Sequence, residues 1–249
     1  MPRLPAFYRL TALDSIDSTN EEARRLADDG AAEGTLVWAL EQTAGRGRRG
    51  RSWASPHGNL YLSLLLRPDC RAGVAAQLGF VAALSLAEAL DPLLPGSLQP
   101  AEVKWPNDIL LQGRKVAGLL LETASRTDGG LDRLVIGVGV NVATHPTDTP
   151  YPATSLAAEG ATTNPAAMLE GFAVVFEAWR GRWLAEGFGP VRAAWLLRAR
   201  GLGQPLTVRL DGETLEGRFA ALDEDGAMLL EWRGGRRRIT AGDVFYPGL

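Results

Sequence analysis

Apolar and polar residues alternate along several short stretches of the chain, which is the pattern of strands in a sheet. Between Asn59 and Leu66, leucine occupies every second position, with Tyr61 and Ser63 between the leucines. Alternation and short apolar runs together predict strands at residues 8–13, 35–40, 59–66, 103–105, 109–111, 116–121 and 134–142.

Other stretches carry apolar residues at helical spacing. Asn164 and Pro165 suit the N-cap and the first position of a long helix. Gly30 stops an earlier helix, and Pro95 with Gly96 stops another. The predicted helices cover residues 20–30, 72–94 and 164–183, with one more that ends near residue 200.

The pattern changes after about Gly203. Short strand-like segments follow one another, separated by the turn sequences DG, DEDG and GG. Such a run of short strands predicts a small β-barrel. We therefore expect two domains, one at residues 1–202 and one at residues 203–249.

One stretch without an apolar face lies between two predicted strands. From Gln42 to Gly58 the sequence reads QTAGRGRRGRSWASPHG, in which glycines alternate with arginines. A run of this kind predicts an exposed loop that an anion would order. It also fits a generic nucleic-acid patch, but because both ends are held by strands, a lid over a pocket fits better.

Polar residues are placed at the ends of other predicted elements. Ser18 with Glu21, and Thr19 with Glu22, fit capping boxes at the first helix. Hydroxyls at a helix N-terminus are also well aimed at a polar ligand, because free backbone N–H groups there favour acceptors.

A second polar group follows the strand at residues 103–105. Asn107, Asp108 and Lys115 stand at strand ends, where side chains can converge. Gly137 and Gly139 share one face of a later strand, with Asn141 two residues beyond. Two glycines on one face of a strand indicate that another group comes close to the backbone.

Composition narrows the function classes. The chain has 249 residues, 46% of them hydrophobic, and a net charge of −3, which argues against a general nucleic-acid binder. No apolar run approaches the roughly 20 residues needed to span a bilayer, and the N-terminus has no signal region, so we expect a cytoplasmic protein. Cys70 is the single cysteine, and the two histidines, His57 and His145, each lie beside a proline. Neither a disulfide nor histidine catalysis is predicted.

The candidate site residues are therefore mostly cations and amides, with one aromatic platform at Trp53. This composition suits the joining of two anions. A carboxylate and a phosphate 4 Å apart repel by about 1 kcal/mol in water and about 4 kcal/mol at an effective dielectric near 20. Fixed Arg and Lys groups cancel that repulsion and stabilise the charge of the transition state. Acyl adenylation is the reaction this favours.

Five motifs carry a resemblance to a known family. They are DSTN (17–20), QTAGRGRRGRSW (42–53), SPHGNLYLS (55–63), VKWPNDILLQGRKVAGLLLE (103–122) and IGVGVNV (136–142). In this order they resemble the biotin–protein ligases, also called biotin–acetyl-CoA-carboxylase ligases. Residues 226–230 are similar to a strand of the family's C-terminal barrel.

The resemblance implies a fold and an activity. The fold is α+β, a mixed β-sheet flanked by helices as in biotin/lipoate ligases, with a small SH3-like β-barrel at the C-terminus. The activity is a two-step ligase reaction: biotin and MgATP give biotinyl-5′-AMP, and the biotinyl group then passes to a lysine of a biotin carboxyl carrier protein domain. Biotin, ATP and Mg²⁺ are the implied ligands.

The resemblance also implies roles for residues. Lys115 and Arg48 are the implied catalytic residues. The implied biotin site comprises Ser18, Thr19, Asn20, Gln42, Arg46, Gly47, Arg48, Lys115, Gly118, Gly137 and Gly139. The implied ATP and adenylate site comprises Arg48, Arg49, Arg51, Trp53, Asn107, Asp108, Lys115 and Asn141.

Within these sets, the implied contacts are more specific. Ser18, Thr19 and Gln42 face the ureido head of biotin, the segment 46–48 covers its carboxylate, and the three glycines give its flat ring room against the sheet. Trp53 stacks on adenine. Asp108 either holds Mg²⁺ through water or helps to deprotonate the acceptor amine, and the residues identify no other metal ligand.

Two features depart from the fullest family pattern. No helix-turn-helix precedes Tyr8, so DNA binding and repression are not expected, and SPHGNLYLS is one residue shorter than usual. A lipoate or octanoate ligase or transferase of the related fold is the alternative enzyme. A nucleic-acid-binding module using residues 46–51 and 236–238 is a second alternative, and a homodimer through a sheet edge stays open.

Overall fold

The computed structural model describes residues 1–128, 130–149 and 151–246. Its strands are β1 (Arg9–Ile16), β2 (Thr35–Gln42), β3 (Leu60–Leu66), β4 (Glu102–Lys104), β5 (Asp108–Leu111), β6 (Arg114–Ser125), β7 (Leu131–Val140), β8 (Pro205–Arg209), β9 (Thr214–Leu222), β10 (Met228–Trp232), β11 (Gly235–Ile239) and β12 (Asp243–Phe245). Its helices are α1 (Thr19–Asp28), α2 (Ala72–Ala75), α3 (Gln77–Leu90), α4 (Pro165–Glu186) and α5 (Phe188–Leu197), with short 3-10 turns η1 (Arg48–Gly50) and η2 (Asp91–Leu93).

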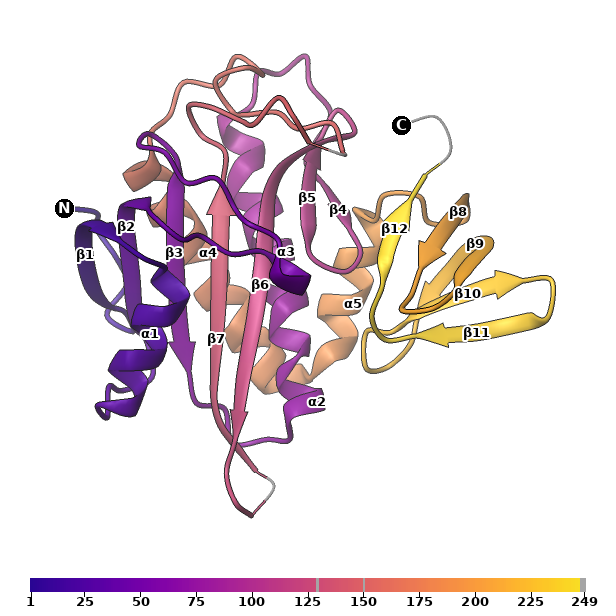
Figure 1. The fold of residues 1–249 in the computed structure, drawn as a ribbon, viewed down its shortest axis with the longest axis horizontal. Coiled ribbons are helices and arrows are strands. Elements are labelled where there is room, and N and C mark those ends of the chain that lie inside the picture. Colours follow the sequence, from indigo (N-terminus) through magenta and orange to yellow (C-terminus); the bar gives the residue numbers. More distant parts are fainter. Residues whose placement is uncertain (129, 150, 247–249) are drawn as a thin grey trace.

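A seven-stranded mixed sheet forms the larger part of the molecule, as the α+β prediction requires. Its strand order is β1-β2-β3-β7-β6-β5-β4, and β1 and β2 run parallel while the other described pairs are antiparallel. Parallel neighbours need a crossover connection, which α1 supplies. Helices α3, α4 and α5 lie behind the sheet in Figure 1, and α1 lies in front of it.

The two faces of this sheet are covered differently. The leucines at 60, 62, 64 and 66 in β3 belong to the large core shared with α3 and α4, whereas Leu65 packs under α1 with Ala23 and Val135. All seven residues of β3 are therefore buried. The second face is closed by α1 and by the segment at residues 42–58, which we call the Arg-rich loop.

The helix predicted at residues 72–94 is interrupted and forms α2, α3 and η2. By length and composition, the stretch Ala72–Leu93 is apolar enough to cross a membrane, with 72% of its most apolar window buried inside the protein. The expectation that no apolar stretch approaches membrane-spanning length was therefore wrong. Burial against the sheet and α4 accounts for its composition, as in the core helix of a soluble protein.

The start of α4 confirms the predicted cap. The Asn164 side chain accepts a hydrogen bond from the Ala167 backbone N–H at 2.9 Å, and Pro165 occupies the first helical position. The Asn164 side chain satisfies one free backbone N–H of the helix, and Pro165, which has no N–H, removes another. Helix α5 follows and ends at Leu197, close to the predicted end near residue 200.

The C-terminal strands form a separate five-stranded antiparallel sheet of order β11-β10-β9-β8-β12. Four of these strands were predicted, whereas β12, three residues long, was missed. The Trp105 indole N–H donates to the Gly226 carbonyl at 3.1 Å, which ties this sheet to the β4–β5 turn. Gly226 has φ +89°, and a Cβ there would lie 2.5 Å from the Phe80 ring. Glycine is therefore required at that contact.

Candidate functional site

A cavity of about 220 Å³ opens on the α1 side of the large sheet. The strands beneath it pair Ser63 with Gly137 and then Leu120, and Tyr61 with Gly139, then Gly118, then Asp108. Of these residues, Asp108, Gly118, Leu120, Gly137 and Gly139 line the cavity floor. The cavity brings together all the predicted site residues except Arg49; it is lined by Ser18, Thr19, Asn20, Gln42, Arg46, Gly47, Arg48, Arg51, Trp53, Asn107, Asp108, Lys115, Gly118, Gly137, Gly139 and Asn141, among others.

The floor glycines make room for side chains of the chain itself. A Cβ on Gly137 would lie 2.1 Å from Asn20 Oδ1, and one on Gly139 would lie 2.6 Å from the Trp53 indole. Gly118 also faces that indole, at 3.2 Å. Glycine indeed allows close approach here, as predicted, but Asn20 and Trp53 occupy the space in this structure. The Trp53 indole nitrogen is buried and finds no hydrogen-bond partner among the residues that the structure describes.

The start of α1 is capped from another strand. Gln42 Oε1 accepts from the Thr19 backbone N–H at 2.8 Å, whereas the Ser18 side chain makes no capping hydrogen bond. The predicted capping boxes were therefore wrong, because Gln42 accepts from the Thr19 N–H and Asp17 Oδ1 accepts from the Ser18 N–H at 2.6 Å, in place of Glu22 and Glu21. Ser18 and Thr19 are each only 3% exposed and lie at the cavity wall, so the Ser18 hydroxyl remains available to a bound group.

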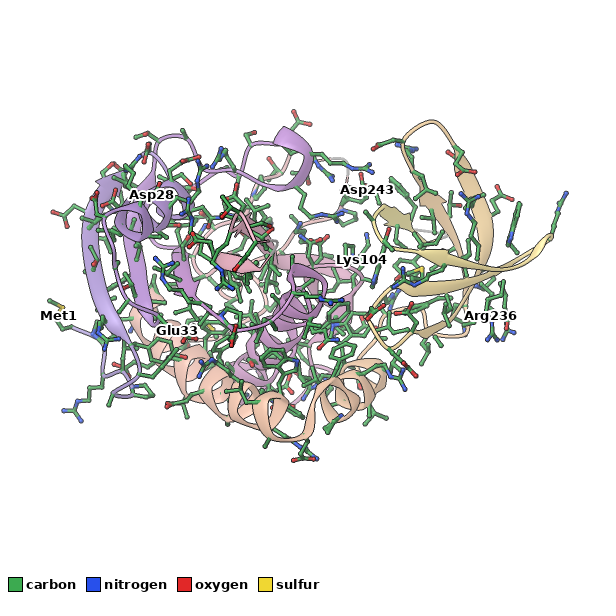
Figure 2. All side chains as sticks on the ribbon, turned by 90° about the horizontal axis from the view of Figure 1, so that it is seen from below. Met1, Asp28, Glu33, Lys104, Arg236 and Asp243 are labelled. Atoms are coloured by element: carbon green, nitrogen blue, oxygen red, sulfur yellow. The ribbon has the colours of Figure 1, made fainter. Side chains whose placement is uncertain are left out.

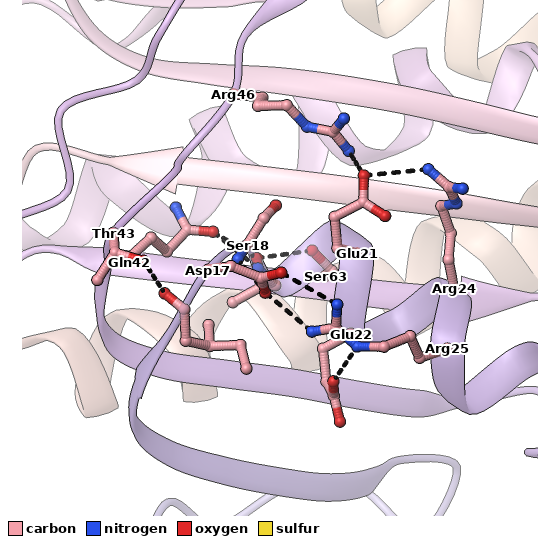
Figure 3. A network of polar contacts seen from close by, with 12 residues as sticks. Asp17, Ser18, Glu21, Glu22, Arg24, Arg25, Gln42, Thr43, Arg46 and Ser63 are labelled. Atoms are coloured by element: carbon pink, nitrogen blue, oxygen red, sulfur yellow. Dashed lines mark hydrogen bonds and ion pairs between the residues drawn. The ribbon is translucent and has the colours of Figure 1, made fainter.

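The Arg-rich loop folds over the cavity and is held by carboxylates. Its backbone forms the 3-10 turn η1, in which Arg49 has φ 55°. Arg46 forms an ion pair with Glu21, and Arg51 forms one with Asp243 at 2.8 Å (Figure 3 shows the Arg46 end). Arg49 contacts Asp243 and Asp211. The loop is thus exposed and ordered by opposite charge, here from the protein itself.

Arg48 is the loop arginine that turns inward. Its Nη1 donates to Asn107 Oδ1 at 3.1 Å and approaches the Gly242 carbonyl at 3.5 Å. Burial lowers the pKa of Arg48, with Asp243 and Asp108 opposing the shift. The guanidinium stays charged nonetheless, since arginine does not lose its proton in proteins. Asn107 in turn donates to the Leu119 carbonyl, so its orientation toward Arg48 is fixed.

Lys115 lies at the centre of the charged end of the cavity. The tight β5–β6 turn, with φ 51° at Gln112 and φ 75° at Gly113, brings it opposite β5. Its Nζ lies 2.6 Å from Asp108 Oδ1 and 5.3 Å from the centre of the Trp53 ring. One amine therefore contacts both the candidate carboxylate and the candidate aromatic platform.

Asn141, 3% exposed, has a structural contact besides its place in the cavity wall. Its Nδ2 donates to the Thr154 carbonyl at 3.0 Å, and its backbone carbonyl accepts from Leu156 N at 3.0 Å. These bonds hold the segment after residue 150 against the sheet.

Three residues at the charged end of the cavity were not predicted: Lys104, Tyr151 and Asp243. Lys104 Nζ lies 4.7 Å from the Tyr151 ring centre, and burial lowers the pKa of Lys104. Asp243 comes from β12, and Lys104 and Asp243 both lie between the two sheets (Figure 2). Lys104 precedes Trp105 in the KWPND motif, which could have indicated it. No local pattern marks Asp243, because only tertiary packing brings it near the loop.

The carboxylates of the cavity suit magnesium bound together with phosphate. Among the described residues no cluster of three His, Cys, Asp or Glu side chains could hold a metal alone. Mg²⁺ commonly keeps its waters and uses one or two carboxylates plus substrate phosphates. Asp108 and Asp243 both line the cavity and could serve in this way; the magnesium role of Asp108 stays a prediction.

Comparison with known proteins agrees with this geometry. Residues 12–141 match the biotin/lipoate A/B protein ligase family, and residues 201–246 match the biotin protein ligase C-terminal domain. The biotin–[acetyl-CoA-carboxylase] ligase of Paracoccus denitrificans is 43% identical over 95% of this chain and 100% of its own length. The bifunctional ligase/repressor BirA of Bacillus subtilis is 35% identical, over 93% of this chain and 72% of its own length.

A solved structure gives the same result. The biotin protein ligase from Aquifex aeolicus in complex with biotin and ATP superimposes with a TM-score of 0.80 and 30% identity, over 95% of this chain and 97% of that one. The superposition covers nearly all of both chains, so the predicted mixed sheet flanked by helices, with a C-terminal domain consistent with an SH3-like barrel, is confirmed. The chain belongs to the biotin/lipoate A/B protein ligase family, among its biotin protein ligases.

Proposed function

We propose that this chain is an ATP-dependent biotin–[acetyl-CoA-carboxylase] ligase, which makes biotinyl-5′-AMP and transfers biotin to a lysine of a carrier protein. One observation supports this most directly: a single cavity has a neutral, hydrogen-bonding end and a cationic end. Ser18, Thr19 and Gln42 supply donors and acceptors for a ureido ring at the neutral end. Arg48, Lys104 and Lys115 supply charge where a carboxylate and a phosphate would meet.

In the first step, a biotin carboxylate oxygen attacks the α-phosphorus of ATP and pyrophosphate leaves. Arg48 and Lys115 reduce the repulsion between these anions and stabilise the charge on the phosphate. Because Asn107 fixes Arg48 and Asp108 fixes Lys115, both cations are oriented before the substrates bind. Mg²⁺, held with the phosphates near Asp108 and Asp243, would supply further charge neutralisation.

In the second step, the acceptor amine attacks the biotinyl carbonyl carbon and AMP leaves. At pH 7 fewer than about one lysine in a thousand is neutral, given a pKa near 10.4. Asp108 is proposed to take the proton, since its Oδ1 lies 2.6 Å from Lys115 Nζ, where the carboxylate and phosphate would meet. The cationic surroundings of Lys104 and Lys115 also disfavour the protonated form of an amine placed beside them.

The remaining site roles belong to this proposal. Trp53 flanks the adenine, Arg49 and Arg51 exchange their carboxylate partners for nucleotide phosphates, and Asn141 borders the nucleotide. The segment 46–48 covers the biotin carboxylate. The catalytic domain comprises residues 1–202, and residues 203–249 form the C-terminal domain.

The biological setting is also proposed. The enzyme acts in the cytoplasm on a biotin carboxyl carrier protein domain and has no membrane partner. DNA binding is not proposed, because the arginines at 46, 49, 51 and 236–238 all contact carboxylates of the chain itself. A homodimer through a sheet edge remains compatible with the fold.

The test is incubation with biotin, MgATP and an apo carrier domain, followed by mass spectrometry of the carrier. A mass increase of one biotinyl group is expected. No product from a competent carrier would contradict the proposal. Exchange of pyrophosphate into ATP with biotin or lipoate then separates this function from the lipoate alternative, because only the accepted acid supports exchange.

A further inference from the structure

A continuous series of polar contacts runs beneath the cavity and joins the two ends of the Arg-rich loop. It starts at Ser55, near one end of the loop, and finishes at Arg46 near the other. The contacts are Gln42 Nε2 to Ser55 Oγ at 2.9 Å, Thr19 N to Gln42 Oε1 at 2.8 Å, Ser63 Oγ with Thr19 Oγ1 at 2.8 Å and with Asn20 Oδ1 at 2.5 Å, Asn20 Nδ2 to Glu122 Oε2 at 2.7 Å, and Arg46 with Glu122 at 3.7 Å.

The directions of these bonds fix the Asn20 side chain. Because an ionised carboxylate can only accept, Asn20 Nδ2 donates to Glu122 and its Oδ1 must face Ser63. Ser63, which is fully buried, has one hydroxyl proton and gives it to Asn20. Thr19 Oγ1 lies 2.8 Å from the Ser63 hydroxyl and donates its own proton to Gln42 Oε1 at 3.1 Å. Asn20 is thus held from both sides. Its side chain lies against the Gly137 backbone, where a residue with a Cβ would occupy the same space.

Glu122 touches the floor and the loop with different oxygens. Its Oε2 accepts from Asn20, and its Oε1 faces the Arg46 guanidinium. Its side chain is 29% exposed, so solvent weakens the ion pair without abolishing it. The resemblance to the biotin–protein ligases implied no role for Ser63 or Glu122.

Glu21 provides a natural comparison with Glu122. It comes from α1, pairs with Arg46 and with Arg24, and makes no described contact with Asn20 (Figure 3). Both carboxylates therefore hold the loop through Arg46. Of the two, Glu122 also holds the cavity floor.

We propose that Glu122 is a positioning residue that couples occupation of the ring pocket to closure of the Arg-rich loop. A ring bound against Asn20 stabilises the Glu122 orientation that also receives Arg46. By linkage, closure of the loop on Arg46 favours the Asn20 orientation that receives the ring. This inference rests on the proposed function only in taking biotin as the ring.

Trypsin cleavage of the loop measures this coupling without any catalytic step, since trypsin cuts after arginine and the loop offers four. The measured quantity is the protection ratio, the cleavage rate without biotin divided by the rate at saturating biotin, with cut sites identified by fragment mass. For the unmodified protein we expect a ratio of about ten, inside the 5- to 150-fold range of coupling between sites.

Matched variants separate coupling from simple loop attachment. Glu21→Gln should speed cleavage with and without biotin alike and leave the ratio within about twofold of the original. Glu122→Ala should reduce the ratio to within about twofold of one, and Glu122→Gln, which keeps an acceptor for Asn20 but loses the charge, should fall between. Ser63→Ala, which releases Asn20 from the other side, should also lower the ratio.

The outcomes are distinct. If the unmodified protein shows neither heat of biotin binding nor protection, the proposed function fails and the coupling fails with it. If biotin protects the unmodified loop and Glu122→Ala retains the full ratio, the coupling alone is overturned. Should Glu122→Ala fail to fold by circular dichroism, an unchanged ratio in both Glu122→Gln and Ser63→Ala overturns it equally.

Discussion

The two faces of the seven-stranded sheet are built from alternate residues of the same strands, yet they do different work. Toward α3 and α4, β3 presents a row of leucines that share one large core. On the opposite face, β3 and β7 present Ser63, which contacts Thr19 and Asn20, and Gly137 and Gly139, which lie against Asn20 and Trp53. A substitution on the first face should change stability, whereas one on the second should change binding and chemistry at little cost in stability.

The largest effect is expected at the charged end of the cavity. Lys115→Ala should reduce the rate of adenylate formation about 10²- to 10³-fold, as does removal of one group that stabilises transition-state charge. Biotin affinity should fall far less, because the ring pocket is unchanged. Pyrophosphate exchange and calorimetry measure the two quantities. Equal losses in both would indicate only a binding role. Arg114→Ala is the neighbouring control, because the half-exposed Arg114 side chain pairs with Glu159 at 2.6 Å and does not line the cavity.

A direct comparison of the faces uses two residues one position apart in the pairing of β3 and β7. Leu64→Ala should lower the free energy of unfolding by about 2–5 kcal/mol and leave kcat/KM of the folded enzyme nearly unchanged. Gly137→Ala should weaken biotin binding about tenfold or more, since its Cβ would displace Asn20. Denaturant unfolding and calorimetry on both variants test this. A Gly137→Ala protein that binds normally would remove the distinction.

Arg48→Ala tests whether the Arg-rich loop retains the adenylate on the cavity face of the sheet. The adenylate should dissociate about tenfold faster or more, because a half-buried, charged hydrogen-bond donor is lost. A filter-binding or stopped-flow measurement of release gives the rate. Arg182→Ala, on the exposed side of α4, controls for loss of an arginine. An unchanged release rate would argue against a closing role for the loop.

The smallest effect concerns Asp17, at the rim of the polar face. Hydrogen bonds from Arg25 and from the Ser18 backbone lower the pKa of Asp17 to about 2. Since this is below the unfolded value near 3.9, the contribution to stability is present above about pH 4 and lost as pH falls through 2. Because the side chain is exposed, we expect less than about 1 kcal/mol. Carboxyl titration by NMR, with Asp17→Asn in unfolding experiments, measures it; a normal Asp17 pKa would contradict it.

Much of the fold could be predicted from local patterns. The strands of the large sheet and the Asn164 cap were predicted because alternation and capping depend on neighbouring residues. The break between α2 and α3 and the strand β12 were missed, since each is short and is decided by packing elsewhere. The capping boxes failed for a related reason: Gln42, from another strand, took the position at the start of α1.

Site residues that lie in a recognisable motif were predicted. Contacts that depend only on how the strands and helices pack were missed. Lys115, Arg48 and the glycines lie in recognisable sequences and do line the cavity. Glu122 closes such a motif, but its contact with Asn20, 102 positions away, exists only once β6 lies beside the start of α1. The same holds for Asp243 and the loop.

The pairing of the Arg-rich loop with Asp243 has a consequence for synthesis of the chain. Arg49 and Asp243 are 194 positions apart, so at about 5–20 residues per second the ribosome needs roughly 10–40 s to supply the carboxylate after it has made the loop. During that interval the nascent polypeptide lacks the Asp243 carboxylate that pairs with Arg49 and Arg51 in the folded protein. A messenger truncated before the codon for residue 243 would yield a product in which the basic segment is never neutralised by β12.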